Sequence, residues 1–250
     1  MLKISIVTVC YNSATTIGGT INSVANQTYT NKEHIIVDGA SKDATMQIVR
    51  ASPSVNHYVT EPDNGIYDAM NKGIAMVTGD IVGTLNADDF YVDDCVLEDV
   101  ARAFSDPEVD ACYSDLVYVA QNDTNRIVRY WRSRPFQLGL FKRGWMPAHP
   151  TFFVRKQVYE ELGSYDLDYK LGSDFELTMR FLEIYRIKAV YIPRVMIKMR
   201  LGGATNKSIA NVIKGNLEAY HACKKNHYSV LPIFIIIKIL LRIPQFFLRP

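Results

Sequence analysis

The sequence predicts an α/β fold with a mostly parallel central sheet. Residues 3–115 alternate short apolar runs, the pattern of buried strands, with longer runs that suit helices. Such alternation indicates repeated strand–helix–strand units. A chain of 250 residues is long enough to bury a sizeable core. Polar residues follow directly after several apolar runs, which is where open α/β sheets bind their ligands.

The elements are predicted in order along the chain. Strands are expected at 4–9, 33–37, 57–59 and 81–85, and helices at 14–26, 43–50 and 66–77. Beyond residue 115 the pattern is less regular, with a Pro-, Gly- and aromatic-rich stretch, two helices, a strand and a helical end, at 135–150, 155–162, 173–185, 188–192 and from about 207. We therefore divide the chain into 1–115, 116–206 and 207–250. No repeat or low-complexity linker separates the first two segments, so they are expected to share a core.

Charge is unevenly distributed. The net charge of the chain is +2, but residues 214–250 contain six basic residues and one acid, which leaves the rest of the chain net acidic. This asymmetry argues against a general nucleic-acid binder and favours a basic tail that meets an anionic lipid surface. The four cysteines are scattered without Cys-x-x-Cys spacing and without a signal peptide, so a reduced, cytoplasmic setting is expected.

The run 79–89 ends an apolar strand on Asn86, Ala87 and the adjacent carboxylates Asp88 and Asp89. Carboxylates at the carboxyl end of a buried strand suit Mg²⁺ or Mn²⁺ shared with a substrate phosphate. The alternative is that Asp88 and Asp89 only cap the helix that begins near Cys95.

Two further strands end in polar residues at the same predicted edge. The first is followed by Tyr11 and Asn12 after Thr8 and Val9, and the second runs into Asp38-Gly39-Ala40-Ser41. An aromatic ring can lie against a nucleobase, and a carboxylate can accept a base N–H. An ordinary turn with a helix cap also explains the second segment. The G-x-G-x-x-G fingerprint is absent after the first strand, which excludes a typical dinucleotide-binding enzyme.

A polar turn at 61–65, with Asp63 and Gly65, leads into a predicted helix that carries Asn71 and Lys72. The turn and the helix start need no function to explain them. A lysine on a short helix next to glycine can, however, act as a point charge toward a phosphate.

Taken together, these motifs resemble the family 2 glycosyltransferases with a GT-A fold. The resemblance covers roughly residues 1–205 and rests on motifs in family order, at 5–12, 38–43, 61–73 and 86–89. It implies a Rossmann-like, mostly parallel sheet flanked by helices, a donor-binding half at 1–115 and an acceptor-binding half at 116–206. By the same resemblance, Thr8, Tyr11 and Asp38 hold the nucleoside, Asp88 the ribose or metal, and Asp89 the metal. Two positions depart from the family pattern: Asn86 replaces an acid, and 199–203 contains no histidine.

The resemblance also implies a catalytic base at Asp174, which opens a helix that continues to Arg180. Ser173 stands where the family usually has Glu, and Ser173 with Glu176 could instead form a capping box. His149 and Trp145 lie in the loop between the halves, where the family contacts phosphate or acceptor. His149 could also merely shape a Pro-flanked loop.

The last segment reads as a membrane-associated helical tail. Residues 230–248 hold fourteen Leu, Ile, Val or Phe residues and the cations Lys238 and Arg242. Insertion scales give roughly −7 kcal/mol for the apolar residues and roughly +6 kcal/mol for the cations, so spanning is near break-even. We expect a helix in the membrane interface with both cations at the headgroups. The alternatives are a buried terminal helix or a dimer contact.

These observations predict an inverting, metal-dependent glycosyltransferase. Its expected donor is a UDP-sugar, and its expected acceptor is a hydroxyl of a polyprenyl-linked glycan in the synthesis of a surface polysaccharide of the O-antigen type. It would act on the cytoplasmic face of the bacterial inner membrane, with Mn²⁺ or Mg²⁺ and without nucleic acid. The alternatives are a sugar nucleotidyltransferase and a non-catalytic sugar- or lipid-binding module.

Overall fold

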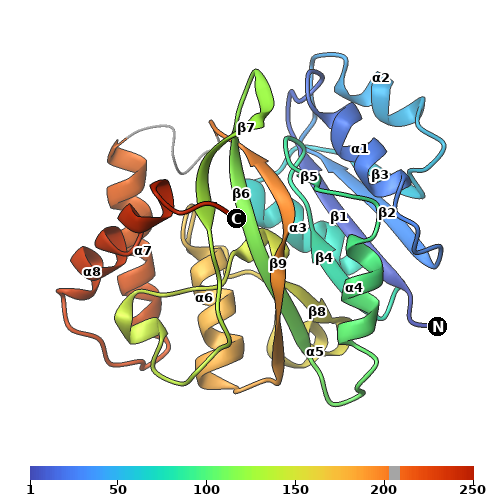
Figure 1. The fold of residues 1–250 in the computed structure, drawn as a ribbon. Helices are drawn as coiled ribbons and strands as arrows, with labels where there is room; N and C mark the ends of the chain where they lie inside the picture. The colour runs from blue at the N-terminus through green and yellow to red at the C-terminus, as the bar shows by residue number, and fades with distance from the viewer. Residues whose placement is uncertain (203–208) are drawn as a thin grey trace.

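The computed structural model describes residues 1–202 and 209–250, and a nine-stranded sheet runs through its centre (Figure 1). The strand order is β3-β2-β1-β4-β8-β6-β9-β5, and β7 pairs with β6 beside this path. The predicted mostly parallel sheet is confirmed, because β3, β2, β1 and β4 are parallel neighbours and β6 pairs with β9 in parallel. Antiparallel pairs enter with β8, β7 and β5.

The first part of the chain follows the predicted order closely. Its elements are β1 (Ile4–Cys10), α1 (Ile17–Ala25), β2 (Lys32–Asp38), α2 (Thr45–Arg50), β3 (His57–Thr60), α3 (Ile66–Met76), β4 (Ile81–Thr84), β5 (Phe90–Tyr91) and α4 (Val96–Ala103). Every residue of β1 and β4 is buried. Strands covered on both faces read as continuous apolar runs, which is why the sequence located them well.

Helices cover both faces of this part of the sheet. Val7 and Val37 pack with α3, whereas Ile36 packs with α1 and α2 on the other face. Gly73 allows the close approach of α3, because a Cβ there would lie 2.2 Å from Val7 Cγ1. The core therefore lies on both sides of β1 and β2, and their carboxyl ends remain as the edge that can carry a site.

The second part contains strands that the sequence did not predict. Its elements are β6 (Ala111–Ala120), β7 (Asp123–Trp131), the short 3-10 turns η1 (Phe141–Arg143) and η2 (His149–Thr151), β8 (Phe153–Arg155), α5 (Lys156–Leu162), α6 (Ser173–Met179), the π-helical turn η3 (Arg180–Ile184) and β9 (Ala189–Arg200). The predicted division between 115 and 116 falls inside β6. Both halves thus share one strand and one sheet.

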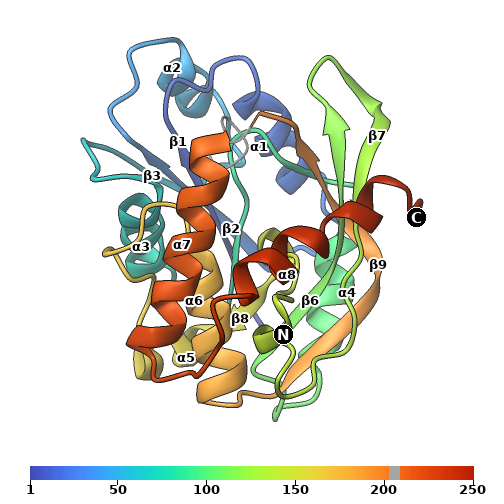
Figure 2. The ribbon, with the colours of Figure 1, turned by 90° about the vertical axis from the view of Figure 1, so that its left-hand side faces the viewer.

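The C-terminal region is helical, as predicted. It contains α7 (Ile209–Lys225), α8 (Phe234–Leu240) and the 3-10 turn η5 (Ile243–Phe246). Figure 2 shows α7 standing beside α6, and α8 crossing from α7 toward β7. In the described ranges 1–202 and 209–250, no helix is both long and apolar enough to cross a membrane. The predicted boundary at 206 and 207 lies outside the described residues, as does Gly203.

Candidate active site

The carboxyl ends of β1, β2 and β4 meet at one edge of the sheet, as the sequence predicted. Cys10 at the end of β1 pairs with Asp38 at the end of β2, and β1 also pairs with β4. The polar segments 11–12, 39–43 and 86–89 therefore start from three neighbouring strands.

Tyr11, Gly39 and Asp63 converge at this edge. The Tyr11 side chain is exposed, at 60%. A Cβ added to Gly39 would lie 2.4 Å from Asp63 Oδ2 and 3.4 Å from Tyr11 Cδ2. The N–H of Gly65, at φ +118°, donates to Asp63 Oδ1 over 2.9 Å and fixes that side chain. An exposed ring beside an oriented carboxylate is suited to a nucleobase, because the ring can stack and the carboxylate can accept an N–H.

Asp38 has a different environment from Asp63. It is fully buried, and its two carboxylate oxygens accept hydrogen bonds from the Ser41 hydroxyl (2.5 Å), the Ser41 N–H (3.0 Å) and the Thr60 hydroxyl (2.6 Å). Asp38 thus holds the turn after β2 and ties it to β3. It presents no exposed carboxylate surface to a base, so the predicted contact fits Asp63 better.

Thr8 and Val9 lie inside the sheet. Thr8 is fully buried, and its hydroxyl lies 2.9 Å from Nε2 of His34, whose pKa burial lowers to about 3. Val9 belongs to the core beneath α3. Because β1 is central and covered on both faces, Thr8 is fully buried and Val9 is only 7% exposed, so their side chains offer a sugar-nucleotide donor little surface, in contrast to the predicted contacts.

Asn12 and Ser41 join the two loops of this edge. Asn12 has a left-handed conformation, with φ +50°. Its N–H donates to Ser41 Oγ over 2.7 Å, and the Lys42 N–H donates to Asn12 Oδ1 over 2.9 Å. The loops after β1 and β2 therefore hold one another in place.

Asn71 and Lys72 are both engaged within the protein. Asn71 donates to the Tyr165 carbonyl (2.8 Å) and accepts from the Tyr165 N–H (2.9 Å). Lys72 Nζ lies 2.9 Å from Glu61 Oε1 and 3.5 Å from Asp68 Oδ2, and these carboxylates raise the pKa of the lysine. The predicted phosphate contact for Lys72 would require it to leave two carboxylates.

Asp88 and Asp89 follow β4, and neither caps α4, because that helix begins after Cys95 without a side-chain cap and the Leu97 N–H in its first turn donates to Gln27 Oε1. Asp89 is fully buried, and Asn86 Nδ2 donates to its Oδ2 over 3.0 Å. Burial, and then the charge of Asp88, raise the pKa of Asp89 well above its usual range, and burial raises that of Asp88. Asn86 thus supplies a hydrogen bond where an acid would add a third negative charge.

Arg200, at the end of β9, is a residue of this site that the sequence did not reveal. Its N–H donates to Asp89 Oδ1 (3.3 Å), and its guanidinium donates to the Asp88 carbonyl. The guanidinium also lies 4.6 Å from the centre of the Phe90 ring. The strand carrying Arg200 begins 78 residues after Ala111, its partner on β6, so spacing in the sequence gave no signal.

The donor set fits a divalent cation that shares its ligands with a substrate. Among the residues that the structure describes, no three His, Cys, Asp or Glu side chains gather as a complete metal cluster. Mg²⁺ is commonly held by one or two carboxylates together with substrate phosphates, and each carboxylate has about four lone-pair sites. Asp89 uses one on each oxygen for Asn86 and Arg200. Asp88 and Asp89 can therefore fill only part of the coordination shell of a divalent cation. The remaining ligands must be phosphate oxygens of the nucleotide-sugar or water.

Asp174 lies on the first turn of α6, with its side chain 18% exposed. Its Oδ1 accepts hydrogen bonds from the Tyr67 hydroxyl (3.2 Å) and the Phe175 N–H (2.8 Å). Its Oδ2 lies 3.0 Å from His149 Nδ1, although the ring is not turned for a hydrogen bond. One oxygen of Asp174 is therefore occupied, and the other is left to accept a proton.

His149 packs edge-on against Trp131, with 5.8 Å between the ring centres. Removal from water lowers the pKa of His149; Asp174 opposes this shift, and the cations Lys238 and Arg242 add to it. The ring is accordingly neutral near pH 7. Trp145 packs against Tyr113, Phe136 and Phe141.

The helix that carries Asp174 is anchored by Glu176. Glu176 forms a buried ion pair with Arg180 (2.8 Å) and accepts a hydrogen bond from Asn226, the residue after α7 (3.1 Å). Arg180 also donates to the carbonyls of the turn after α5. The suggested capping box is absent, because no side chain caps α6 and Ser173 Oγ is buried without a partner among the described residues.

Lys238 and Arg242 do not both point to a membrane, contrary to expectation. Lys238 is 6% exposed, and its ammonium lies 4.1 Å from the centre of the ring of Phe175, the residue that follows Asp174. Burial, and then Arg242, lower the pKa of Lys238 to about 7, while Asp174 opposes the shift. The charged face of α8 turns inward because Phe234 of the same helix packs on Phe175.

Tyr118 on β6 is buried, and burial raises the pKa of its hydroxyl; Arg129 and Arg242 lower that pKa, and Asp89 and Asp174 raise it.

This fold is that of a glycosyltransferase of the GT-A class. The Glycosyl transferase family 2 profile matches residues 5–163, and the chain belongs to that family. The chain is 31% identical over 182 residues to a PGL/p-HBAD biosynthesis glycosyltransferase of Mycobacterium bovis, covering 70% of this chain and 68% of the relative. It is 29% identical over 180 residues to an uncharacterized glycosyltransferase of Mycobacterium tuberculosis, covering 71% and 68%.

Solved structures share the fold. TarS 1–349 of S. aureus in complex with UDP-GlcNAc superposes with a TM-score of 0.65 at 17% identity, over 90% of this chain and 65% of that one. The mannosyltransferase PcManGT of Pyrobaculum calidifontis, in complex with GDP-Man and Mn²⁺, gives a TM-score of 0.66 at 18% identity, over 96% and 73%. The predicted family and fold are thereby confirmed.

Proposed function

We propose that this protein is an inverting glycosyltransferase that moves a sugar from a UDP-sugar to a hydroxyl of a lipid-linked glycan during surface polysaccharide synthesis. The observation that carries the proposal is Asp174. This partly exposed carboxylate is oriented through one oxygen by Tyr67 and the backbone, while its other oxygen lies open beside His149. A general base needs both a fixed direction and a free lone pair.

The base acts through Oδ2. The acceptor hydroxyl loses its proton to Asp174 Oδ2, and its oxygen attacks the anomeric carbon from the face opposite the leaving diphosphate. The product therefore has inverted configuration. Neutral His149 does not hold Asp174 Oδ2 in an ion pair, as an imidazolium cation would, and it is placed to contact the acceptor or a phosphate.

The donor lies along the carboxyl edge. Tyr11 stacks on the nucleobase, and Asp63 accepts a hydrogen bond from it. Asp88 and Asp89 would provide ligands for Mn²⁺ or Mg²⁺. The cation, when bound, offsets the charge that develops on the departing diphosphate. A UDP complex of TarS and a GDP-Man complex of PcManGT are known, so both nucleotides belong in the test.

A donor panel tests the reaction. The protein is incubated with Mn²⁺ and with UDP-, GDP- or dTDP-sugars, and nucleotide release is measured with wild type and with Asp174→Asn. We expect UDP release that depends on the metal and on Asp174. Release from GDP-sugars alone would contradict the UDP assignment, and equal release by Asp174→Asn would contradict the role of the base.

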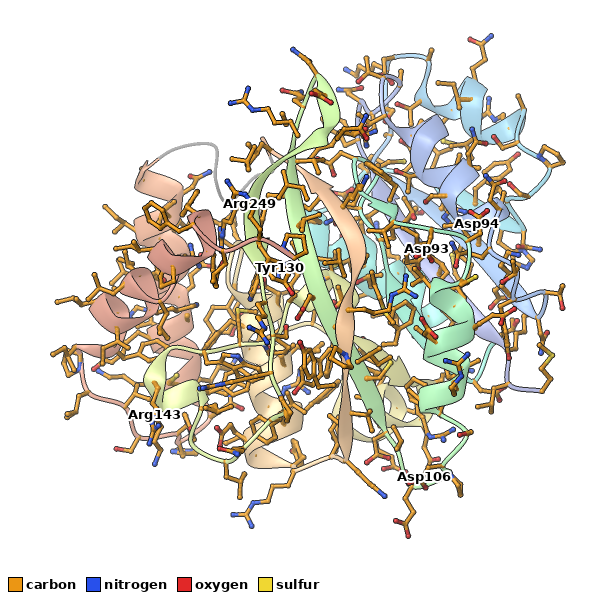
Figure 3. The ribbon with its side chains drawn as sticks, viewed as in Figure 1. Asp93, Asp94, Asp106, Tyr130, Arg143 and Arg249 are labelled. Atoms are coloured by element: carbon orange, nitrogen blue, oxygen red, sulfur yellow. The ribbon has the colours of Figure 1, made fainter. Side chains whose placement is uncertain are left out.

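A calorimetric titration tests the metal site. UDP is titrated into wild type, Asp89→Asn and Asp94→Asn, each with and without Mn²⁺. Figure 3 shows Asp93 and Asp94 at the edge beside α1 and α4, away from the tail, so Asp94 is an exposed control for charge. We expect Mn²⁺ to strengthen UDP binding in wild type and Asp94→Asn but not in Asp89→Asn. Equal metal dependence in all three would remove Asp89 from the site.

We also propose that the tail binds the cytoplasmic face of the inner membrane, through its apolar rather than its charged face. Leu231 and Phe247 are 73% and 80% exposed. Burying one such side chain contributes about 1.5–3 kcal/mol. Phe247→Ser should weaken sedimentation with anionic vesicles at least about fivefold, and Leu167→Ser, an exposed leucine far along the chain from the tail, should leave it unchanged. Sedimentation unaffected by Phe247→Ser would contradict this orientation.

A further inference from the structure

A cavity of about 480 Å³ lies between β7, the loop that follows it, and the tail. Figure 2 shows the end of the tail running from α8 toward β7, so the two walls come from distant parts of the sequence. Its wall contains five cations: Arg129, Arg132, Arg134, Lys238 and Arg242. Among its described lining residues there is no Asp or Glu.

These cations are not neutralised elsewhere. Within the described part of the chain, none of the five forms an ion pair with a carboxylate, although the same structure pairs Lys72, Arg180 and Arg194 with acids. Arg129 is held in place by Gln245 of the tail, which accepts from its Nε over 2.7 Å. A concentration of unpaired guanidinium groups is suited to a phosphate, because each presents a fork of donors.

The loop that carries two of the arginines is built to present them. Ser133 is buried, its N–H donates to Asp115 Oδ1 (2.6 Å), and its hydroxyl donates to the Ser114 carbonyl (2.9 Å). Asp115 is otherwise occupied by the hydroxyls of Tyr130 and Tyr191. With Ser133 fixed inward, its neighbours Arg132 and Arg134 are exposed at the cavity.

The cavity adjoins the base and an apolar surface. Trp131 lines it and also packs against His149, and Lys238 lines it while lying over Phe175, the residue after Asp174. Leu241 and Leu248 line the opposite wall and are themselves partly exposed. A ligand with a charged head and an apolar chain matches both surfaces.

We propose that this cavity binds the diphosphate head group of an amphiphilic acceptor, with Arg132, Arg134 and Arg242 as its ligands and the apolar tail surface beneath its chain. The inference rests on the proposed function, and it assigns the acceptor's anchor to a site built jointly by the loop after β7 and the tail. The glycan attached to the diphosphate is then directed toward Asp174.

Both tryptophans of the chain, Trp131 and Trp145, line the cavity, so intrinsic fluorescence reports its occupancy. Farnesyl diphosphate is titrated in the presence of saturating UDP, which fills the donor site. Inorganic pyrophosphate and farnesol are titrated in parallel. We expect farnesyl diphosphate to bind at least about tenfold more tightly than either. Equal binding of pyrophosphate would identify a site for free phosphate and overturn the lipid assignment, and equal binding of farnesol would overturn the role of charge.

The variant Arg132→Gln/Arg134→Gln tests the residues. Both side chains are exposed and without acidic partners in the described structure, so the fold should be preserved, and farnesyl diphosphate affinity should fall at least tenfold. Arg143→Gln is the matched control, because Figure 3 places Arg143 on the η1 segment and it does not line the cavity. Equal losses in both variants would reduce the effect to general surface charge.

The same titration is repeated with Asp174→Asn. If Asp174→Asn still binds farnesyl diphosphate but no longer releases nucleotide, binding in the cavity does not depend on the proposed base. If wild type releases UDP but does not bind farnesyl diphosphate, the proposed diphosphate site is wrong and the proposed reaction is unaffected.

Discussion

The donor edge of the sheet and the tail side of the molecule differ in how their charged residues are paired. At the donor edge, Asp38 is surrounded by hydroxyl and N–H donors, and Lys72 contacts two acids. On the tail side, Arg132, Arg134 and Arg242 have no acidic partner in the described structure. Internal pairing fixes geometry before a ligand arrives, whereas unpaired charge is left for the ligand to neutralise. Substitutions of the internally paired residues should therefore affect stability, and substitutions of the unpaired residues should affect binding.

The largest expected effect is that of Asp174→Asn. An amide cannot accept the acceptor proton, so transfer should fall by about 10²–10⁴-fold while UDP affinity stays within about twofold. Steady-state transfer and UDP calorimetry on the same preparation separate the two. A loss of transfer rate below about tenfold would assign the role of general base to another residue.

Glu176→Gln tests the pairing that holds α6, the helix that carries Asp174. Breaking a buried ion pair costs about 3–5 kcal/mol, and the lower value is expected because Arg180 keeps its carbonyl partners. Glu160→Gln breaks an exposed pair at the same i,i+4 spacing, with Lys156, and should cost less than about 1 kcal/mol. Urea unfolding measures both, and similar costs for the two would show that burial of the pair does not matter.

Asp38→Asn and Asp63→Asn sharpen the comparison within the donor edge. The Asp38 variant places an amide among donors and should lose about 1–3 kcal/mol of stability. The Asp63 variant should keep its stability within about 0.5 kcal/mol, but should bind UDP roughly tenfold more weakly, a loss of about 1.4 kcal/mol. Thermal unfolding measures the stability of both variants, and calorimetry measures their affinity for UDP. The reverse result would return the base contact to Asp38.

Lys238→Met should make the protein more stable and its ligand binding weaker. The folded-state pKa of Lys238, about 7, lies below its ordinary value of 10.5, because burial and Arg242 outweigh Asp174 and Cys223, with His149 also nearby. The unfolded chain therefore binds more protons between pH 7 and 10, and wild-type stability should rise with pH relative to the variant. The slope is on the order of 1 kcal/mol per pH unit.

Urea unfolding at pH 7, 8 and 9 measures this difference. Subtracting the Lys238→Met curve from the wild-type curve removes groups common to both. If the difference in unfolding free energy does not change with pH, the pKa of Lys238 is that of a solvated lysine. That result would weaken the contrast between paired and unpaired charge.

The sequence predicted β1 to β4, their helices and the edge of the sheet at which Asp88 and Asp89 lie, because buried parallel strands leave a continuous apolar pattern and their ends leave polar residues. It did not predict the hairpin of β6 and β7. Ser114 and Asp115 interrupt the apolar run of β6, and their burial depends on partners such as Ser133 that follow in the chain.

Side-chain direction was the second limit. Lys238 and Arg242 share one helix face at i,i+4 spacing, but the sequence does not reveal which surface that face meets. Phe234 decides it by packing on Phe175. Likewise, Thr8 and Asp38 have suitable chemistry in suitable motifs, and only the three-dimensional arrangement shows that their polar atoms are already used.

The strand β6 also has a consequence for how the protein is made. β1 to β4 pair among strands close in the sequence, but β6 pairs with β9 through Ala111 and Ala189, and Asp89 accepts a hydrogen bond from the N–H of Arg200 at the far end of that strand. Contacts between distant residues form late because long loops must close first. During synthesis the donor edge should therefore assemble before the acceptor side exists. The protein should become active only after residues well beyond Arg200 have left the ribosome.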